Sequence, residues 1–348
     1  MTTTSDRADL TGGASPVDFD AYGDYGAYRR KPADRQQSGD GQQSGGTPSA
    51  SFVRAPYPFR GRITADGASG YPAQAGRYHL YISWACPWAQ RSAIVRALLG
   101  LQDVISLSAV DPIRDGRGWA FRAGEGHGLD PVNGFAFLSE AYEATEPGYD
   151  GHVSVPVLWD KQTGAIVSNN FPDITIDLDT QFGAFADPAV RLYPEELRPE
   201  IDALNEVVYA SVNNGVYRCG FARSQQAYTE AVTELFRVLD ELEQRLAGRR
   251  YLLGPDLTEA DVRLWVTLAR FDVVYYSHFK ASVRRLADYP NLWAYARDLY
   301  SIPAFRSTTN FDHIKRHYYV TQGNINPTRI VPVGPYPDWD EPHGRDAL

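Results

Sequence analysis

The sequence predicts two folded domains: an α/β domain, and after it a domain built only from helices. Strand patterns and short helical patterns alternate between residues 77 and 185. Beyond residue 185, apolar residues recur every three or four positions over long stretches, as in amphipathic helices. The chain has 348 residues, of which 43% are hydrophobic, and this is enough for two cores of ordinary size.

The α/β domain is predicted to follow the order of elements found in thioredoxin. Apolar and polar residues alternate over 78–82, which predicts a first strand, and a helix over 89–99 ends at Gly100. Further strands are expected over 104–110, 153–159 and 166–167, and a helix over 171–178. A strand, a helix, a strand, two more strands and a helix make up the thioredoxin-like arrangement.

The all-helical domain is predicted from two strong patterns. Apolar residues over 228–246 recur at helical spacing. A second helix is expected to begin at Thr258, where Thr258 and Asp261 form a capping-box pair and Leu257 with Val262 fits a hydrophobic staple. This helix is apolar on nearly all sides, so we expect it to be central and buried.

These patterns divide the chain into four parts. Residues 1–50 are rich in Gly, Ser and Gln and are expected to form a disordered leader. The thioredoxin-like domain, with an irregular N-terminal strap, is assigned to 51–185, and the helical domain to 186–310. The extension 311–348 carries many aromatic residues and prolines, so it is expected to pack back on the body.

Charge and cysteine content narrow the class of protein. Lys plus Arg is 34 and Asp plus Glu is 43, a net charge of −9, which disfavours nucleic acid as a partner. No apolar run approaches the roughly 20 residues that span a bilayer, and the N-terminus has no signal-peptide pattern. Two cysteines are too few for a secreted disulfide scaffold. These features together predict a cytoplasmic protein.

Cys86 is the residue with the clearest chemistry. It follows the first predicted strand and opens a helix, where unpaired N–H groups and the helix dipole favour a thiolate. Pro87 suits the first helical turn. A dithiol enzyme would have a second cysteine at the position of Ala89, so any resolving thiol comes from elsewhere. The alternative is a buried structural cysteine, which this strand–turn–helix position disfavours.

Other candidate residues have weaker signals. Pro156 interrupts a strand pattern, which a cis Val155–Pro156 peptide beside Cys86 would explain, although an edge strand would also tolerate proline. Cys219 is expected to be a small buried hydrophobe. His313 and His317 are four residues apart, but no third ligand is evident, so no metal site is predicted.

Several segments together resemble one family. YISWACPWAQR, LTEADVRL, RFDVVYYSHFK, DYPNLW and NFDHIKRHYY look like the Xi-class glutathione transferases, the glutathionyl-hydroquinone reductases, in order from about Pro56 to Pro335. LTEAD is common to many transferases, whereas CPWA, VNNGVY and HIKRHYY are more specific. The resemblance implies the glutathione transferase fold, a homodimer, and no bound redox cofactor.

The resemblance also implies roles for residues. Cys86 would attack the sulfur of a small thiol joined to a hydroquinone ring, and a second thiol would release the resulting mixed disulfide. Tyr217 would transfer a proton to the leaving carbon. Tyr275 and Tyr318 would line the pocket and favour the thiolate, and Trp119 would bind the thiol.

Two departures from the family pattern concern thiol recognition. In SNNFPDI, Asn170 and Phe171 stand where the family has the Glu and Ser that hold the γ-glutamyl end of glutathione. His152 stands where an Arg is usual. We therefore expect a thiol other than glutathione, with mycothiol as the leading candidate, because it lacks the γ-glutamyl zwitterion. Asn169 and Asn170 would bind its sugar hydroxyls.

The sequence is also compatible with two classes of function other than a hydroquinone reductase. The first is a thiol transferase of the same fold that exchanges thiols and disulfides on other small substrates. The second is a non-catalytic binding module, which the presence of Cys86 with three family-matched tyrosines disfavours. Replacement of Cys86 by serine separates them, because only a binding module would be unaffected.

Overall fold

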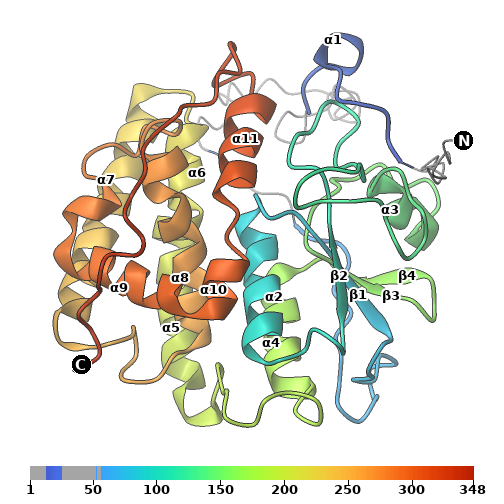
Figure 1. Cartoon of the computed structure of the whole chain (residues 1–348), viewed down its shortest axis with the longest axis horizontal. Helices are drawn as coiled ribbons and strands as arrows, with labels where there is room; N and C mark the ends of the chain where they lie inside the picture. The colour runs from blue at the N-terminus through green and yellow to red at the C-terminus, as the bar shows by residue number, and fades with distance from the viewer. Residues whose placement is uncertain (1–12, 26–51, 53–55) are drawn as a thin grey trace, which may run out of the picture.

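A four-stranded mixed sheet forms the centre of the α/β domain in the computed structural model, which describes residues 13–25, 52 and 56–348 (Figure 1). The strands are β1 (Tyr78–Ile82), β2 (Ser106–Ala109), β3 (Val157–Asp160) and β4 (Ala165–Ser168). Their order is β2-β1-β3-β4, with β1 parallel to β2 and antiparallel to β3. Strand β4 is antiparallel to β3, and the thioredoxin-like topology is confirmed.

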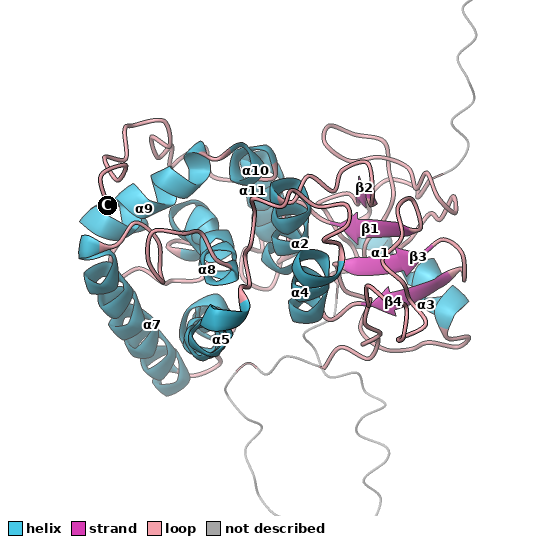
Figure 2. Ribbon diagram, turned by 90° about the horizontal axis from the view of Figure 1, so that it is seen from below, coloured by secondary structure: helices cyan, strands magenta, loops and turns pink. Residues whose placement is uncertain are grey.

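Helices cover both faces of this sheet (Figure 2). The helices of the domain are α2 (Pro87–Leu98), α3 (Ser139–Thr145) and α4 (Phe171–Gln181). Helices α2 and α4 pack together between the sheet and the helical domain, and α3 lies on the opposite face. The carboxyl end of β1 and the N-termini of α2 and α4 therefore lie near the boundary between the two domains.

The third strand begins later than its sequence pattern suggested. Strand β3 starts at Val157, and residues 153–156 form no strand. Pro156 has no N–H to donate to a neighbouring strand, so pairing ends there. The bond between Val155 and Pro156 is cis, as the sequence predicted. The first helix begins at Pro87, two positions before the expected start.

The helical part of the chain packs around α8. Its helices are α5 (Arg198–Val207), α6 (Gly215–Gly220), α7 (Gln225–Arg245), α8 (Glu259–Arg270), α9 (Pro290–Ser301), α10 (Pro303–Ser307) and α11 (Phe311–Thr321). Nearly every residue of α8 is buried, as predicted. The N–H and the hydroxyl of Thr258 both donate to the carboxylate of Asp261, each at 2.8 Å, so the predicted capping pair is confirmed. Short π-helical segments lie at Val208–Asn213 and Phe271–Tyr275.

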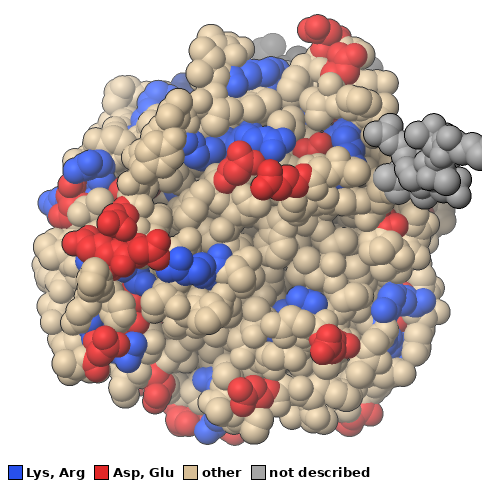
Figure 3. Space-filling model, in the orientation of Figure 1, with Lys and Arg blue, Asp and Glu red and all other residues tan. Residues whose placement is uncertain are grey.

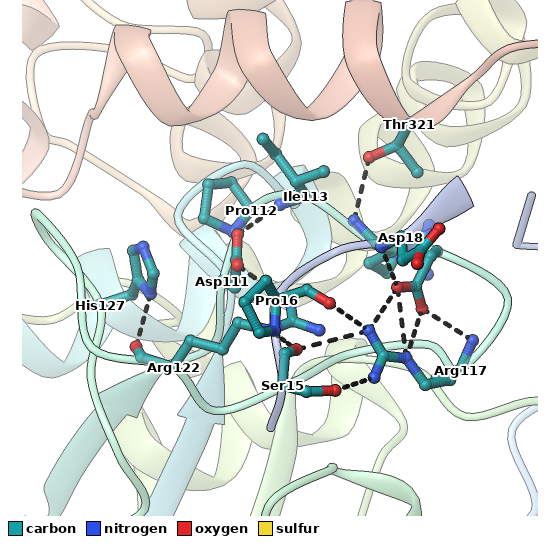
Figure 4. A network of polar contacts seen from close by, with 12 residues as sticks. Ser15, Pro16, Asp18, Asp111, Pro112, Ile113, Arg117, Arg122, His127 and Thr321 are labelled. Atoms are coloured by element: carbon teal, nitrogen blue, oxygen red, sulfur yellow. Dashed lines mark hydrogen bonds and ion pairs between the residues drawn. The ribbon is translucent and has the colours of Figure 1, made fainter. Parts of the chain in front are cut away.

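Residues 13–25 form an ordered segment with the short helix α1 (Phe19–Tyr22), so the expectation of a disordered leader is wrong for this part. Figure 4 shows how it is held. The Arg117 guanidinium donates to the Ser15 hydroxyl at 2.5 Å, to the Pro16 carbonyl at 2.6 Å and to Asp115 at 2.6 Å. The side chain of Arg122 also donates to the Ser15 carbonyl. Such charge-assisted bonds offset the entropy of ordering a polar segment. The rest of the predicted leader lies outside the described residues.

The C-terminal extension runs along the helical domain (Figure 1). The ring of Trp339 packs against Trp265 and Trp293 at centroid distances of 5.5 and 4.8 Å. Arg345 donates to the Leu246 carbonyl at 3.0 Å. Acidic and basic side chains are interspersed over the face in Figure 3. Within the described ranges, no helix has the length and hydropathy that crossing a bilayer requires.

Candidate active site

Cys86 is the residue that precedes helix α2. Its φ and ψ of −80° and 119° are extended, and its carbonyl accepts the N–H of Gln90 at 3.0 Å, which makes it the N-cap. The side chain is partly exposed. Its Sγ lies 3.6 Å from the Val155 carbonyl oxygen, a distance at which the thiol donates a hydrogen bond. The sulfur therefore lies at the positive end of a helix and beside the segment that precedes Pro156.

A buried arginine from the helical domain fixes the turn before this cysteine. Arg270, in the last turn of α8, donates to the Trp84 and Ala85 carbonyls, both at 3.0 Å. The same guanidinium donates to the Gln90 side chain at 2.5 Å. The turn and the first turn of α2 are thus held by one residue of the other domain. The site depends on how the two domains pack.

Cys86 opens into a narrow pocket lined by residues of both domains. The sequence-predicted residues that line it are Cys86, Trp119, His152, Val155, Tyr217 and Tyr318. The structure therefore brings together six candidates that lie far apart in the chain, from Cys86 to Tyr318. Tyr275 and Pro156 do not line this pocket. The Tyr275 hydroxyl contacts that of Tyr318, and Pro156 follows Val155 through a cis peptide bond.

Three tyrosine hydroxyls form a chain at the wall of the pocket. The Tyr217 and Tyr318 oxygens lie 2.5 Å apart, and the Tyr275 and Tyr318 oxygens lie 3.0 Å apart. All three side chains are buried. Burial raises the pKa of Tyr275, and it raises the pKa of Tyr318 well above the ordinary value of a phenol. Tyr275 and Tyr318 are therefore protonated at neutral pH and can donate hydrogen bonds.

Trp119 and two basic side chains form another wall. The ring of His317 stacks on Trp119 at a centroid distance of 5.1 Å and an interplanar angle of 17°. Burial, with a smaller effect of Arg114, lowers the pKa of His317 to about 3, so its imidazole is neutral. The Arg114 guanidinium lies 4.0 Å from the Trp119 ring centroid. His152 also lines the pocket, and its Nδ1 lies 3.1 Å from the Tyr25 hydroxyl.

Asn169 does not fit the ligand contact that we expected of it. The side chain is fully buried, its Oδ1 accepts the Phe59 N–H at 3.2 Å, and its Nδ2 donates to the Tyr142 hydroxyl at 3.1 Å. Both ends of the amide thus bond to other parts of the chain. Asn169 fastens the strap before β1 to the α/β domain, and its amide is not turned toward a ligand.

Asn170 and Phe171 line a second pocket, which adjoins the first at Tyr57. This pocket has about 890 Å³ of empty space and is also lined by Asp202, Glu206, Tyr209 and Arg263, among others. Phe171 packs on Trp88 at a centroid distance of 4.7 Å, and Asn170 donates to Asp173 at 2.6 Å. An aromatic ring therefore occupies the start of α4.

The sequence reasoning missed several lining residues. Tyr57, Arg114, Ser154, His317 and Gln322 line the Cys86 pocket but were not proposed as site residues. His317 could have been found, because it precedes Tyr318 in the segment that carries the family resemblance. Arg114 belongs to no motif, and only its place five residues before Trp119 hints at the site.

Cys219 and His313 do not line the Cys86 pocket. Cys219 is buried in α6, and burial raises its pKa to about 12, so it remains a thiol. His313 Nε2 contacts the Glu125 carbonyl at 2.7 Å. Among the described residues, no cluster of His, Cys, Asp and Glu has the geometry to hold a metal ion.

Comparison with known proteins identifies both domains. Residues 85–181 match the glutathione S-transferase N-terminal domain, and residues 225–298 match the glutathione S-transferase C-terminal domain. The chain is 48% identical to the glutathionyl-hydroquinone reductase YqjG of Escherichia coli, over 85% of this chain and 92% of the relative. It is 46% identical to the reductase PcpF of Sphingobium chlorophenolicum, over 82% and 90% of the two chains.

Solved structures agree with these matches. The glutathione-bound structure of the Escherichia coli protein superposes with a TM-score of 0.81 at 48% identity, and the match covers 83% of this chain and 96% of the other. The Xi glutathione S-transferase of Phanerochaete chrysosporium superposes with a TM-score of 0.80 at 47% identity, over 82% and 98% of the chains. The chain belongs to the Xi-class glutathione transferases, the family of the glutathionyl-hydroquinone reductases.

Proposed function

We propose that this protein releases hydroquinones from their conjugates with a small thiol. The observation that carries the proposal is the placement of the Cys86 sulfur, at a helix N-terminus, in one pocket with the hydroxyl-linked Tyr217 and Tyr318. The relatives named as glutathionyl-hydroquinone reductases support the same reaction.

The proposed reaction has two steps. The Cys86 thiolate attacks the conjugate sulfur, a disulfide forms, and the bond between sulfur and ring carbon breaks. The electron pair passes to the ring, whose carbon takes a proton from the Tyr217 hydroxyl. A second thiolate then attacks the mixed disulfide and leaves as a symmetric disulfide, which restores Cys86. Two thiol equivalents are oxidised while the conjugated ring is reduced to hydroquinone.

Tyr318 completes the proton path in this proposal. It lies between Tyr217 and Tyr275, so a proton lost by Tyr217 can be replaced along the chain of hydroxyls. Tyr275, although it does not line the pocket, orients Tyr318. Trp119, His152 and the Val155 backbone would bind the thiol part of the conjugate, beside the cysteine.

Two thiols are candidates for the co-substrate. Glutathione is supported by the relatives, one of which has been solved with glutathione bound. Mycothiol is supported by Phe171 and by the neighbouring pocket, whose aromatic and carboxylate side chains suit a sugar. Turnover of menadiol conjugated to each thiol compares them, and faster turnover of the glutathione conjugate would exclude mycothiol as the preferred thiol.

The alternative is a transferase that exchanges thiols with other small disulfides. The alternative also needs Cys86, but it needs no proton at carbon. Replacement of Tyr217 by phenylalanine therefore separates the two functions. The proposed reductase loses hydroquinone release and keeps exchange with a small disulfide, whereas an exchange enzyme keeps its main activity. Homodimer formation is a further proposal from the family resemblance, and sedimentation equilibrium tests it.

A further inference from the structure

The ordered N-terminal segment, residues 13–25, ends against the wall of the candidate active-site pocket. The Tyr25 hydroxyl donates to the Val153 carbonyl at 3.1 Å and lies 3.1 Å from His152 Nδ1. The Tyr25 ring also covers the guanidinium of Arg114, which lies 4.1 Å from the ring centroid. Arg114 and His152 both line the pocket, so Tyr25 contacts two residues of its wall.

This wall leads to the nucleophile. The backbone that accepts the Tyr25 hydroxyl continues to Val155, whose carbonyl oxygen is 3.6 Å from Cys86 Sγ. Arg114 is 5% exposed, and its guanidinium contacts two rings, 4.1 Å from the Tyr25 centroid and 4.0 Å from the Trp119 centroid. Because a guanidinium is attracted to aromatic faces, removal of Tyr25 takes away one of these two contacts. The position of Tyr25 therefore affects both the basic part of the wall and the backbone beside the sulfur.

The segment itself is held by contacts at the surface and not by a hydrophobic core. None of the four residues of α1 is buried. Arg329, in the C-terminal extension, donates to Asp24 at 2.5 Å, and its guanidinium lies 3.6 Å from the Phe19 ring centroid. The two side chains of this ion pair are 26% and 24% exposed. Partly exposed ion pairs contribute little each, so the segment can leave the body of the protein without opening a core.

Gly116 lies directly against this segment. Its N–H donates to the Gly23 carbonyl at 2.8 Å, so the two backbones are in contact. A Cβ at position 116 would collide with the Tyr22 carbonyl oxygen, and only glycine allows so close an approach of two backbones. Glycine is therefore required at this position for the segment to lie on the body of the protein. A methyl group there would displace the segment and change no residue that lines the pocket.

We propose that residues 13–25 are a lid on the Cys86 pocket, and that Tyr25 is the positioning residue through which the docked lid completes the pocket wall. The inference rests on the proposed function and adds control of conjugate binding to it. Lid docking and conjugate binding stabilise each other, because both are favoured by the same arrangement of Arg114 and the Val153 backbone. An open lid lowers the affinity for the conjugate and leaves the chemical step as it is.

Hydrogen exchange of the full-length protein without ligand, and turnover of the menadiol–glutathione conjugate, test the lid. Gly116→Ala should increase the deuterium uptake of residues 14–25 and of residues 151–155 together. It should raise KM for the conjugate by about 5- to 100-fold and leave kcat unchanged, because ground-state and transition-state binding are weakened equally. Arg329→Met, which frees the lid from its other side, should shift both measurements in the same direction. Gly128→Ala is the matched control, because a Cβ there meets open space, and it should change neither.

Uptake that rises at residues 14–25 without a rise at 151–155, or with KM unchanged while the conjugate is turned over, would overturn the proposal, because the lid would then open without affecting the pocket. Unchanged uptake at residues 14–25 in both variants would overturn it as well. A lower kcat at unchanged KM would show an effect on the chemical step, and that result also contradicts a lid. If the unmodified protein does not turn the conjugate over, the proposed function fails, and the joint change in uptake still decides whether the lid supports the pocket wall.

Discussion

The hydroxyl oxygens of Tyr217 and Tyr318 lie 2.5 Å apart, in a buried contact between α6 and α11. At this distance the two phenols share a strong hydrogen bond, and Tyr318 also contacts Tyr275 at 3.0 Å. Of these three tyrosines, Tyr217 and Tyr318 line the Cys86 pocket, and Tyr275 does not. The three residues therefore differ in what each can do for a substrate.

Replacing single tyrosines should show how much each hydroxyl contributes to hydroquinone release. Tyr217→Phe is expected to lower kcat for hydroquinone release by about 10²- to 10⁴-fold, because the proton donor to carbon is lost. Tyr275→Phe should lower it less, by about 10-fold or below, because Tyr275 does not line the Cys86 pocket and acts through its hydrogen bonds to the other two tyrosines. Steady-state turnover of menadiol conjugates measures both. Equal losses in the two variants would contradict the assignment of Tyr217 as donor.

The pH dependence of hydroquinone release should reflect the buried phenols. Burial raises the pKa of Tyr275 and Tyr318, so each keeps its proton at a higher pH than an exposed tyrosine. Tyr275 and Tyr318 should therefore lose their protons only above about pH 10. Single-turnover release, followed from pH 7 to pH 10, should show no descending limb from these groups. A descending midpoint between pH 8 and 9 would count against phenols as the proton source.

Arg270 should be needed for the position of the nucleophile. Arg270→Met leaves the buried Ala85 carbonyl and the partly buried Trp84 carbonyl without their donor, at a cost of about 2 to 4 kcal/mol in the free energy of unfolding. Urea unfolding measures this cost, and the alkylation rate of Cys86 should change with it. Arg237→Met, at an exposed ion pair on α7, is the control and should leave both measurements unchanged. A wild-type alkylation rate in Arg270→Met would show that the turn needs no support from α8.

Buried histidines should make the fold sensitive to mild acid. Burial lowers the pKa of His79 and His278 to about 4 and that of His317 to about 3, whereas the unfolded chain has values near 6.5. Between these values the unfolded state binds more protons than the folded state. Stability should therefore be complete above pH 6.5 and fall as pH drops, by about 1 kcal/mol per pH unit for each histidine.

Urea unfolding at pH 5, 6 and 7 checks this dependence. His79 lies away from the Cys86 pocket, between the Ser106 and Ser108 hydroxyls, so it is the residue to replace. His79→Asn should reduce the slope of stability against pH between pH 5 and 6 by the contribution of one proton. An unchanged slope would mean that His79 takes up its proton in the folded state.

The N-terminal segment should depend on Arg117. Arg117→Met removes the bonds to Ser15 and Pro16, so residues 14–25 should take up deuterium faster in hydrogen exchange. The exchange of α8 should not change, because α8 lies within the helical domain, away from α1 (Figure 1). If residues 14–25 remain protected, the contacts of Tyr25 and Arg329 suffice to hold the segment.

Much of the fold could be predicted from the sequence, because local patterns determine it. The strand at Tyr78–Ile82 and the helix at Glu259–Arg270 follow from apolar periodicity and a capping pair. The structural features that local patterns did not predict depend on contacts between residues far apart in the chain. Residues 13–25 are held in place by Arg117 and Arg122, which lie about 100 positions away in the chain. Nothing in a Gly- and Ser-rich leader predicts these contacts.

Local sequence patterns likewise predict only part of the candidate site. The residues around Cys86 and Pro156 in the sequence predict that both belong to the site. A family resemblance predicts the three tyrosines. Asn169 looked like a ligand contact because it adjoins Asn170, yet its amide is bonded to Phe59 and Tyr142. Arg114 became a candidate only when its burial beside Trp119 in the Cys86 pocket was visible in three dimensions.

Intact-protein mass measurement after reaction with a menadiol–glutathione conjugate tests the central claim most directly. The account predicts one thiol bound as a disulfide to Cys86, with one free hydroquinone released for each thiol bound. Cys219→Ser should behave like the unmodified protein, because Cys219 is buried and its pKa is raised to about 12. Hydroquinone release at the full rate by Cys86→Ser, or the thiol found on Cys219, would contradict the account.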